Sequence, residues 1–493
     1  MGAMMADPNQ IWQQRAGLLL LAGMVFKLVV AWSFPLGVDE AYAVAVAREF
    51  SWSFYDHPPV GFWLPVASAS VFGESALAYR LPFVLCGLGT GALLYLIGAH
   101  LGGAKAGFYT LLLFLIAPHM LFGSGAFVVP DGPLNLGGAL VACAMVHMAG
   151  DDTPPMRFWV LGGFGLLLAM GSKYQAGLIP FGVLSFMFLT TGRWRWITQP
   201  GFWVAVGMGL VGVAPVIFWN IANDWVSFGF HGSRTERSLQ LGNFAAMLAG
   251  QLIYLLPATF VLALIGVGRA FSANPSQRVL AHLALWPIIL FNLIYLFSDA
   301  SFPHWTMPGF VFALPLVGLA LAEGISRVWR WAYLGFGGMI WALVLVLLVH
   351  IPSGVLAPDE GIASWDRTEE VFDWSALASS LEVSVGFDGT QVILADSWIE
   401  AGQLSSGLAM GQGHAPVIRV LGLPHHFGFM SGSRAQGEAL YLVPDRADRL
   451  DADAALSRAQ QIDPNARPLG HVILPRGARP YAGVVVIGVT ISE

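Results

Sequence analysis

Charged residues and cysteines are both scarce in this chain of 493 residues. Asp, Glu, Lys and Arg together make up 11% of it, and the formal net charge is −6 at pH 7. A small negative charge without a basic run argues against a nucleic-acid partner. The two cysteines, Cys86 and Cys143, both lie in apolar runs, so no disulfide framework can be read from them and the redox compartment stays open.

Apolar residues are correspondingly abundant, at 56% of the chain. This is more apolar surface than a soluble core of this size can bury, so we predict an integral membrane protein. A span needs roughly 20 apolar residues, and backbone groups in lipid must pair internally, which favours helices. On that basis we predict about eleven spans, at residues 16–33, 80–99, 106–122, 133–149, 158–171, 174–190, 202–220, 243–267, 279–297, 307–323 and 331–350. Bulky residues rather than a cleavage site follow the first run, so we interpret it as an uncleaved span.

Lysine and arginine are divided unevenly between the two sets of loops that these spans define. One set holds Arg15, Lys105, Arg157, Arg193, Arg195, Arg269, Arg278, Arg327 and Arg330. The opposite set holds Arg48, Arg80, Lys173, Arg234 and Arg237. By the positive-inside rule the first set is cytoplasmic, with the amino terminus inside and the carboxyl end outside. The outer loops hold nearly every polar cluster of the membrane half, so we expect the chemistry there.

The composition changes abruptly after His350. Charged residues become frequent, and short β-branched runs at 391–395, 416–421, 439–443, 471–474 and 483–490 alternate with helical stretches. This alternation predicts a soluble α/β domain over residues 351–493, after a transmembrane domain over 1–350 with an outer loop at 34–79. No inverted repeat is evident, which weakens the usual transporter architecture.

The first outer loop contains two adjacent acids, Asp39 and Glu40, and continues into the sequence Asp56-His57-Pro58-Pro59. An N-cap followed by a first-turn acid is the simpler explanation of the pair. A cap accounts for only one acid, so the pair is also a candidate for chemistry. His57 is either a metal ligand or a structural hydrogen-bonding group, and a lone histidine before two prolines is more often the latter.

Two further outer segments contribute an acid and a lysine. The sequence Pro130-Asp131-Gly132-Pro133 is a turn in which the aspartate can cap the next helix, yet it lies on the same side as Asp39. The sequence Ser172-Lys173-Tyr174 places an ammonium at the outer end of two spans. Snorkelling is the general explanation of such a lysine. An anionic ligand explains why it lies on the side where positive charge is scarce.

Basic and aromatic groups follow in two later outer loops. Arg234 and Arg237 suit bidentate binding of phosphate, with a solvated loop paired through Glu236 as the alternative. His304 and Trp305 lie at the outer end of the ninth and tenth predicted spans, where a tryptophan is usually an interfacial anchor.

Together these residues place carboxylates and cations on one face, beside apolar helices that can hold a lipid tail. Transfer of a group from a lipid-linked phosphate needs this combination. A carboxylate can act as general base toward an acceptor hydroxyl, and Lys or Arg offsets the charge that develops on the departing phosphate. Charge within the spans is nearly absent apart from Lys27, so a proton or ion relay has little to use.

The same motifs resemble those of a known family. Asp39-Glu40-Ala41-Tyr42, the sequence Tyr55 to Pro59, the Pro130-Asp131 pair, Ser172-Lys173-Tyr174 and His304-Trp305 are similar to those of bacterial family 39 glycosyltransferases of the GT-C fold. Relatives in that family include protein O-mannosyltransferases and lipid A aminoarabinose and galacturonic acid transferases. The resemblance covers most of residues 30–350. It implies a polytopic α-helical fold and an inverting transfer from a polyprenyl-phosphate sugar donor.

The resemblance also implies roles for individual residues. Asp39 corresponds to the catalytic base or central acid, Glu40 to its support, and Asp131 to a second acid. Lys173, with Arg234 and Arg237, corresponds to the donor phosphate-binding group. The other residues implied to line the site are Tyr55, Asp56, His57, Tyr174, His231, His304 and Trp305. Some family members use a divalent metal ion, but this chain shows no clear ligand set, so a metal is left open.

We therefore predict a multi-pass glycosyltransferase of the bacterial inner membrane, with its site facing the periplasm. It would move a sugar from undecaprenyl phosphate to a lipid, glycan or protein acceptor. One alternative is a transporter or flippase of lipid-linked glycans, which would favour polar residues deep within the spans. The other is a non-catalytic scaffold whose outer domain binds a partner. The sugar, the acceptor, the oligomeric state and the role of the outer domain stay open.

Overall fold

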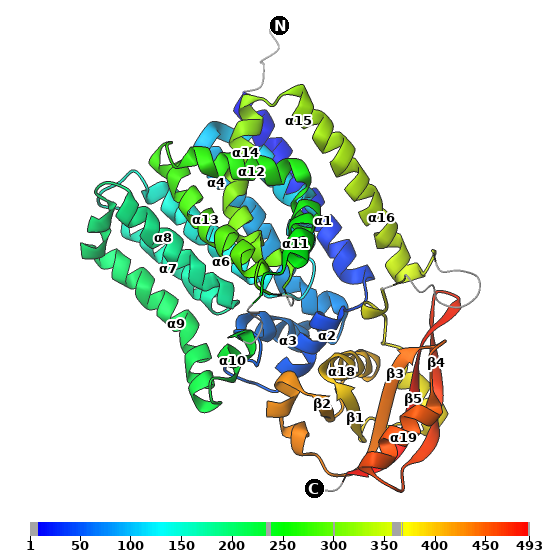
Figure 1. Cartoon of the computed structure of the whole chain (residues 1–493). Helices are drawn as coiled ribbons and strands as arrows, with labels where there is room; N and C mark the ends of the chain where they lie inside the picture. The colour runs from blue at the N-terminus through cyan, green and yellow to red at the C-terminus, as the bar shows by residue number, and fades with distance from the viewer. Residues whose placement is uncertain (1–7, 233–237, 299–300, 357–365, 367, 492–493) are drawn as a thin grey trace. The chain divides into compact units, whose positions relative to one another are not determined.

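The computed structural model describes residues 8–232, 238–298, 301–356, 366 and 368–491 (Figure 1). The chain folds into two compact units. The first, which we term the helical unit, comprises Met1–Val29, Trp52–Gly61 and Pro82–Ala342. The second, the sheet unit, comprises Val30–Ser51, Phe62–Leu81 and Leu343–Glu493. Much of the first predicted outer loop therefore groups with the C-terminal residues.

Helices, most of them apolar and several of them long, make up the first part of the chain, as its composition requires. They are α1 (Pro8–Ser33), α4 (Ala76–Ile116), α5 (Pro118–Phe122), α6 (Asp131–Met148), α7 (Met156–Met170), α8 (Leu178–Leu189), α9 (Pro200–Ala222), α10 (Val226–Gly232), α11 (Leu241–Leu255), α12 (Pro257–Ala270), α13 (Pro275–Tyr295), α14 (Met307–Glu323), α15 (Arg327–Ala332) and α16 (Gly338–Ser353). The 3₁₀ turns η1 (Tyr174–Gly177) and η3 (Pro303–Thr306) precede α8 and α14.

Six helices in the described part of the chain are long and apolar enough to cross a membrane. A seventh span results if α11 and α12, which are bent by 99° at their junction, count as one. The prediction of eleven spans is not confirmed, although each predicted span overlaps a helix. Two predicted spans lie largely within α4, where Gly102 and Gly103 interrupt the helical backbone and the φ of 76° at Gly103 favours glycine. Others correspond to helices of 12 to 18 residues, such as α8 and α6.

Glycines set the spacing of the helices that position the site. A Cβ atom on Gly137 of α6 would lie 2.5 Å from the carbonyl oxygen of Gly165 in α7, and 2.7 Å from the nitrogen of Ala169. A Cβ on Gly212 of α9 would lie 2.4 Å from the carbonyl oxygen of Leu167 in α7. Small residues at such positions let membrane helices pack backbone against backbone.

The sheet unit contains a five-stranded mixed sheet in the order β2-β1-β3-β5-β4 (Figure 1). The strands are β1 (Val392–Ser397), β2 (Ile418–Leu423), β3 (Gly437–Arg446), β4 (Arg467–Arg476) and β5 (Arg479–Ile491). Strand β1 is parallel to β2 and β3, whereas β5 is antiparallel to β3 and β4. The five β-branched runs predicted from the sequence all coincide with these strands. The helices of this region are α17 (Leu377–Val385), α18 (Trp398–Gln412) and α19 (Ala452–Ile462).

The first outer loop contains two helices, α2 (Val38–Ala47) and α3 (Val60–Phe72). Helix α2 lies wholly in the sheet unit. The cores differ in kind. One large apolar cluster fills the helical unit, whereas Leu394, Tyr441 and Ile487 from neighbouring strands form part of a smaller cluster in the sheet unit.

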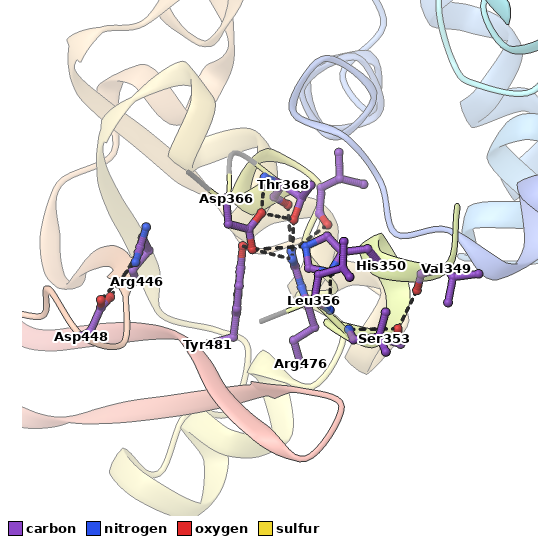
Figure 2. A network of polar contacts seen from close by, with 12 residues as sticks. Val349, His350, Ser353, Leu356, Asp366, Thr368, Arg446, Asp448, Arg476 and Tyr481 are labelled. Atoms are coloured by element: carbon purple, nitrogen blue, oxygen red, sulfur yellow. Dashed lines mark hydrogen bonds and ion pairs between the residues drawn. The ribbon is translucent and has the colours of Figure 1, made fainter. Parts of the chain in front are cut away.

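A buried polar network connects the end of α16 to the sheet (Figure 2). The carboxylate of Asp366 accepts hydrogen bonds from Thr368 Oγ1 at 2.6 Å and from Tyr481 at 3.2 Å. It also lies 3.5 Å from His350 Nε2 and 3.7 Å from Arg476. The Arg476 guanidinium stacks 3.6 Å from the centre of the Tyr481 ring. These contacts link His350, near the end of α16, to Tyr481 and Arg476 of the sheet through Asp366.

Candidate active site

Asp131 and Lys173 form a buried ion pair in the helical unit. The Lys173 ammonium donates to Oδ2 of Asp131 at 2.7 Å, and both side chains are more than nine-tenths buried. The contact follows from the packing of α6 and α7. Gly137, early in α6, lies against Gly165 and Ala169, late in α7, so the helices are antiparallel. The residue that begins α6 and the residue just after α7 therefore meet at one end of the pair.

The Lys173 ammonium controls the pKa of the Asp131 carboxyl. Burial raises this pKa, but the effect of Lys173, with smaller contributions from His304 and His119, is larger, so the pKa lies well below its usual value. Its second oxygen, Oδ1, is buried and has no hydrogen-bond partner among the described residues. A buried acceptor without a partner is costly and uncommon, and catalytic or ligand-binding groups are among its explanations.

Two histidines stack beside this ion pair. The ring of His119, in α5, lies 5.9 Å from that of His304, in η3, with only 8° between their planes. The Tyr254 ring also stacks on His119, with 5.2 Å between the ring centres. Nε2 of His119 is buried without a partner in the described part of the chain. His304 is among the predicted site residues, whereas His119 is not. Its only sequence signal is a histidine after a proline at the end of an apolar run.

The segment 52–61 docks against both turns that lead into this ion pair. The amide of Val60 donates to the carbonyl of Gly171 at 2.8 Å, two residues before Lys173. A Cβ atom on Gly61 would lie 3.2 Å from Cα of Pro130, which directly precedes Asp131. The predicted Tyr55-Asp56-His57-Pro58-Pro59 motif is thus brought to the same end of the helical unit as Asp131 and Lys173.

Five other predicted residues of this unit, namely Tyr55, Asp56, His57, Tyr174 and His231, form an adjoining cluster. Nδ1 of His57 lies 3.1 Å from the Asp56 carboxylate, and Nε2 of His231 is hydrogen-bonded to the Asp56 carbonyl at 2.9 Å. The ring of Tyr174 meets that of His231 edge-on at 5.0 Å, and Tyr55 packs against Phe230 at 4.9 Å. The cluster holds α10 and η1 against segment 52–61.

Trp305 packs differently. Its ring lies 5.8 Å from Phe291 and 6.2 Å from Tyr295, both in α13. These contacts are ordinary helix packing, so Trp305 is explained without a ligand.

Asp39 and Glu40 lie in the sheet unit, at the start of α2. Gly37 is the N-cap residue, and its amide donates to Oε2 of Glu40 at 3.0 Å, so the expected capping contribution comes from Glu40. Buried Arg80 holds the same carboxylate through two hydrogen bonds. Asp39 occupies the first turn of α2 with an exposed side chain. Because α2 belongs to a separate unit, the gathering of Asp39 with Asp131 and Lys173 stays a prediction.

Two other expectations concern arginines and metal. Arg234 and Arg237 fall in 233–237, outside the described residues. Among the residues that are described, no three His, Cys, Asp or Glu side chains are placed to share a metal ion. Asp56 with His57 provides at most part of a ligand set.

Comparisons with known proteins agree with this architecture. The family model for dolichyl-phosphate-mannose-protein mannosyltransferase matches residues 56–219. An undecaprenyl phosphate-alpha-4-amino-4-deoxy-L-arabinose arabinosyl transferase from Shewanella sediminis (strain HAW-EB3) is 24% identical over 195 residues. That match covers 34% of this chain and 36% of the relative, so it spans little more than a third of the relative's length.

Two solved structures share the fold. The crystal structure of ArnT from Cupriavidus metallidurans bound to undecaprenyl phosphate has a TM-score of 0.65 at 16% identity, covering 96% of this chain and 97% of that one. The arabinofuranosyltransferase AftD from Mycobacteria has a TM-score of 0.51 at 15% identity, covering 99% of this chain and 42% of that one. The resemblance to GT-C glycosyltransferases, including aminoarabinose transferases and O-mannosyltransferases, is confirmed. The chain is a multi-pass membrane protein of this fold.

Proposed function

We propose that this protein is a membrane glycosyltransferase of the bacterial inner membrane that uses undecaprenyl phosphate as the carrier of its sugar donor. The acceptor is a lipid, a glycan or a protein on the periplasmic side. The observation that carries the proposal is the buried Asp131–Lys173 pair, with an unpartnered carboxylate oxygen beside two stacked histidines. The matching family model and the shared ArnT fold support it.

Lys173 is suited to the phosphate of the donor. An ammonium has three N–H donors, and Asp131 takes only one of them. The other two can donate to a phosphate, and the charge of Lys173 offsets the charge that the phosphate gains as the bond to the sugar breaks. Asp131 holds the ammonium in place through an ionised carboxylate.

Asp39 is proposed as the carboxylate at the reacting centre. An acceptor hydroxyl oxygen attacks the anomeric carbon from the face opposite the phosphate, which gives inversion. The carbon–oxygen bond to the phosphate breaks, polyprenyl phosphate leaves with the bonding electrons, and the acceptor proton passes to the carboxylate. Where the acceptor is itself a phosphate no base is needed, and Asp39 would position the acceptor instead.

The test compares envelope material from a strain that lacks the protein with the same strain carrying wild-type protein or Asp39→Asn. Mass spectrometry of lipid A, glycolipids and envelope glycans identifies the sugar that disappears. We expect wild-type protein to restore it, and Asp39→Asn at equal abundance to restore none. Full restoration by Asp39→Asn would contradict the proposal. Movement of a lipid-linked glycan across proteoliposomes without a new glycosidic bond would instead support a flippase.

A further inference from the structure

Helix α2, which carries Asp39 and Glu40, packs backbone to backbone against α18 of the C-terminal region. A Cβ atom on Gly402 of α18 would lie 2.8 Å from both the nitrogen and Cα of Tyr42. Real Cβ atoms do not approach backbone this closely, so only glycine fits. One turn later on α18, Ser406 Oγ donates to the carbonyl of Ala41 at 2.8 Å. Both contacts fall on the two residues that directly follow Glu40.

The Tyr42 side chain makes a second set of contacts in the sheet unit. Its ring lies 5.0 Å from Trp398, the first residue of α18, and 6.0 Å from Phe427. Its hydroxyl accepts a hydrogen bond from the His426 amide at 3.2 Å. The preceding residue, His425, has a φ of 45°, which is rare outside glycine, and stacks on Trp398 at 4.8 Å. The C-terminal region therefore surrounds this tyrosine from α18 and from the segment after β2.

The end of α2 is held as well. The Glu49 carboxylate, two residues beyond the helix, accepts hydrogen bonds from the amide and the hydroxyl of Ser431, both at 2.9 Å. At the other end, the Arg80 guanidinium donates to the carbonyls of Phe34 and Pro35 at 2.7 Å, just before α2. The helix that carries Asp39 is thus fixed before, along and after its length.

We propose that the C-terminal domain positions the catalytic carboxylate, and that Gly402 and Ser406 are positioning residues for Asp39. This inference rests on the proposed function of Asp39. A domain that served only to recruit the acceptor would not need backbone contact with the helix bearing the acid. Misplacing a reacting group by about 1 Å can lower turnover by roughly 100-fold. The close contact between Gly402 and Tyr42 limits such a displacement of α2.

The test uses two matched pairs of variants in the full-length protein. Gly402→Ala pushes α18 away from Tyr42. Gly407→Ala also introduces a steric clash on the same helix, because its Cβ would lie 2.4 Å from Cβ of Trp374, but this clash does not involve α2. Both changes gain the same helix propensity, about 1 kcal/mol. Ser406→Ala removes the hydrogen bond to Ala41, and Ser405→Ala is its control, because Ser405 makes no hydrogen bond to α2 in the described structure.

Three readouts are measured for each variant at equal protein abundance. The first is amide hydrogen exchange of residues 38–47, which needs no ligand. The second is the amount of the sugar product that wild-type protein restores to the envelope. The third is binding of undecaprenyl phosphate to the purified protein.

We expect Gly402→Ala to speed exchange in α2 and lower the product about tenfold or more, with binding of undecaprenyl phosphate within twofold of wild type. Ser406→Ala should also speed exchange in α2 and lower the product, but by less than Gly402→Ala. Gly407→Ala and Ser405→Ala should match wild type in exchange of α2 and in product, even where they lower the melting temperature. Product at the wild-type level in Gly402→Ala, or an equal loss in Gly407→Ala, would overturn the inference.

The proposed function can fail separately. Full product from Asp39→Asn would overturn that function and this inference with it. Loss of product in Asp39→Asn together with wild-type product in Gly402→Ala would overturn the inference alone.

Discussion

Arg80 binds the Glu40 carboxylate through two hydrogen bonds, from Nε to Oε1 at 2.7 Å and from Nη2 to Oε2 at 2.5 Å. Both side chains are buried, with exposed fractions of 0% and 6%. Glu40→Gln leaves the guanidinium charge buried without its partner, and we expect a loss of about 3–5 kcal/mol in unfolding free energy. Arg80→Lys should also lower the unfolding free energy, because an ammonium lacks the planar arrangement of donors that binds both carboxylate oxygens. Thermal unfolding of the purified protein measures both.

The Arg48–Glu74 pair provides the control. It is also held by two hydrogen bonds, at 2.9 and 2.7 Å, but its side chains are 18% and 23% exposed, so Glu74→Gln should cost about 1 kcal/mol or less. Equal losses from Glu40→Gln and Glu74→Gln would show that the burial of the first pair does not matter.

Asp131 and Lys173 allow a double-mutant cycle that separates pairing from phosphate binding. Asp131→Asn and Lys173→Met should each destabilise the protein, because each leaves a buried partner uncompensated. The double variant should recover much of the stability, since neither charge remains. The double variant should still fail to bind undecaprenyl phosphate, because it lacks the Lys173 ammonium. Recovery of binding in the double variant would rule out Lys173 as the phosphate group. Lys105→Met, which removes a lysine that bonds to the Ala322 carbonyl, is the control for loss of a lysine.

His119 is predicted to act through its nitrogens as well as its ring. His119→Phe keeps an aromatic ring in contact with Tyr254 and His304 but removes the hydrogen-bonding group. We expect a melting temperature near wild type and product lowered roughly 10-fold or more, within the usual range for loss of a proton-transferring or hydrogen-bonding group. His119→Ala should in addition lose about 0.5–1.5 kcal/mol of stacking for each ring contact. If His119→Phe makes as much product as wild-type protein, this histidine only packs against its neighbours.

Asp366 should make the stability of the sheet unit depend on acid. Burial raises the pKa of its carboxyl, but hydrogen bonds from Thr368 and the nearby charges of Arg476 and His350 lower it, and the folded-state pKa lies below its usual 3.8. The charged form therefore stabilises the fold. Its contribution is fully present above about pH 4 and is lost as the pH falls through the folded-state value. Asp366→Asn should lower the melting temperature at neutral pH and flatten its fall toward pH 3.

Asp388 is a close match for this experiment. It accepts the same pair of hydrogen bonds from Thr390, at 2.9 and 2.6 Å, but is exposed and lacks the arginine and histidine. Asp388→Asn should change the neutral-pH melting temperature less than Asp366→Asn. If the two variants behave alike, the network in Figure 2 contributes little beyond the local turn.

Much of the site in the helical unit follows from local sequence signals. Asp131 and Lys173 attract notice as a turn acid and an unexpected cation, and they meet because consecutive helices such as α6 and α7 pack antiparallel with adjacent ends. His119 was missed because a lone histidine at the end of an apolar run usually has a packing role. Its stacking on His304 arises only from tertiary structure.

The contact between α18 and α2 could not be predicted from the sequence for a related reason. Gly402 lies far along the chain from Tyr42, and a glycine within a helix has many explanations until its neighbour is known. Strand β5 was recognisable because its run of valine and isoleucine favours a strand. The predicted number of spans is not confirmed, because short helices such as α8 carry the same apolar signal as full-length ones.

The close fit of Tyr42 against Gly402 also limits how this protein can be recombined with its relatives. A chimera that exchanges residues 343–493 alone would join an α18 from one parent to an α2 from the other, with no tolerance for a different side chain at the crossing. The natural unit of exchange includes Val30–Ser51 and Phe62–Leu81 as well. A chimera that exchanges all three segments takes α2 and α18 from the same parent, so the contact between Tyr42 and Gly402 is preserved.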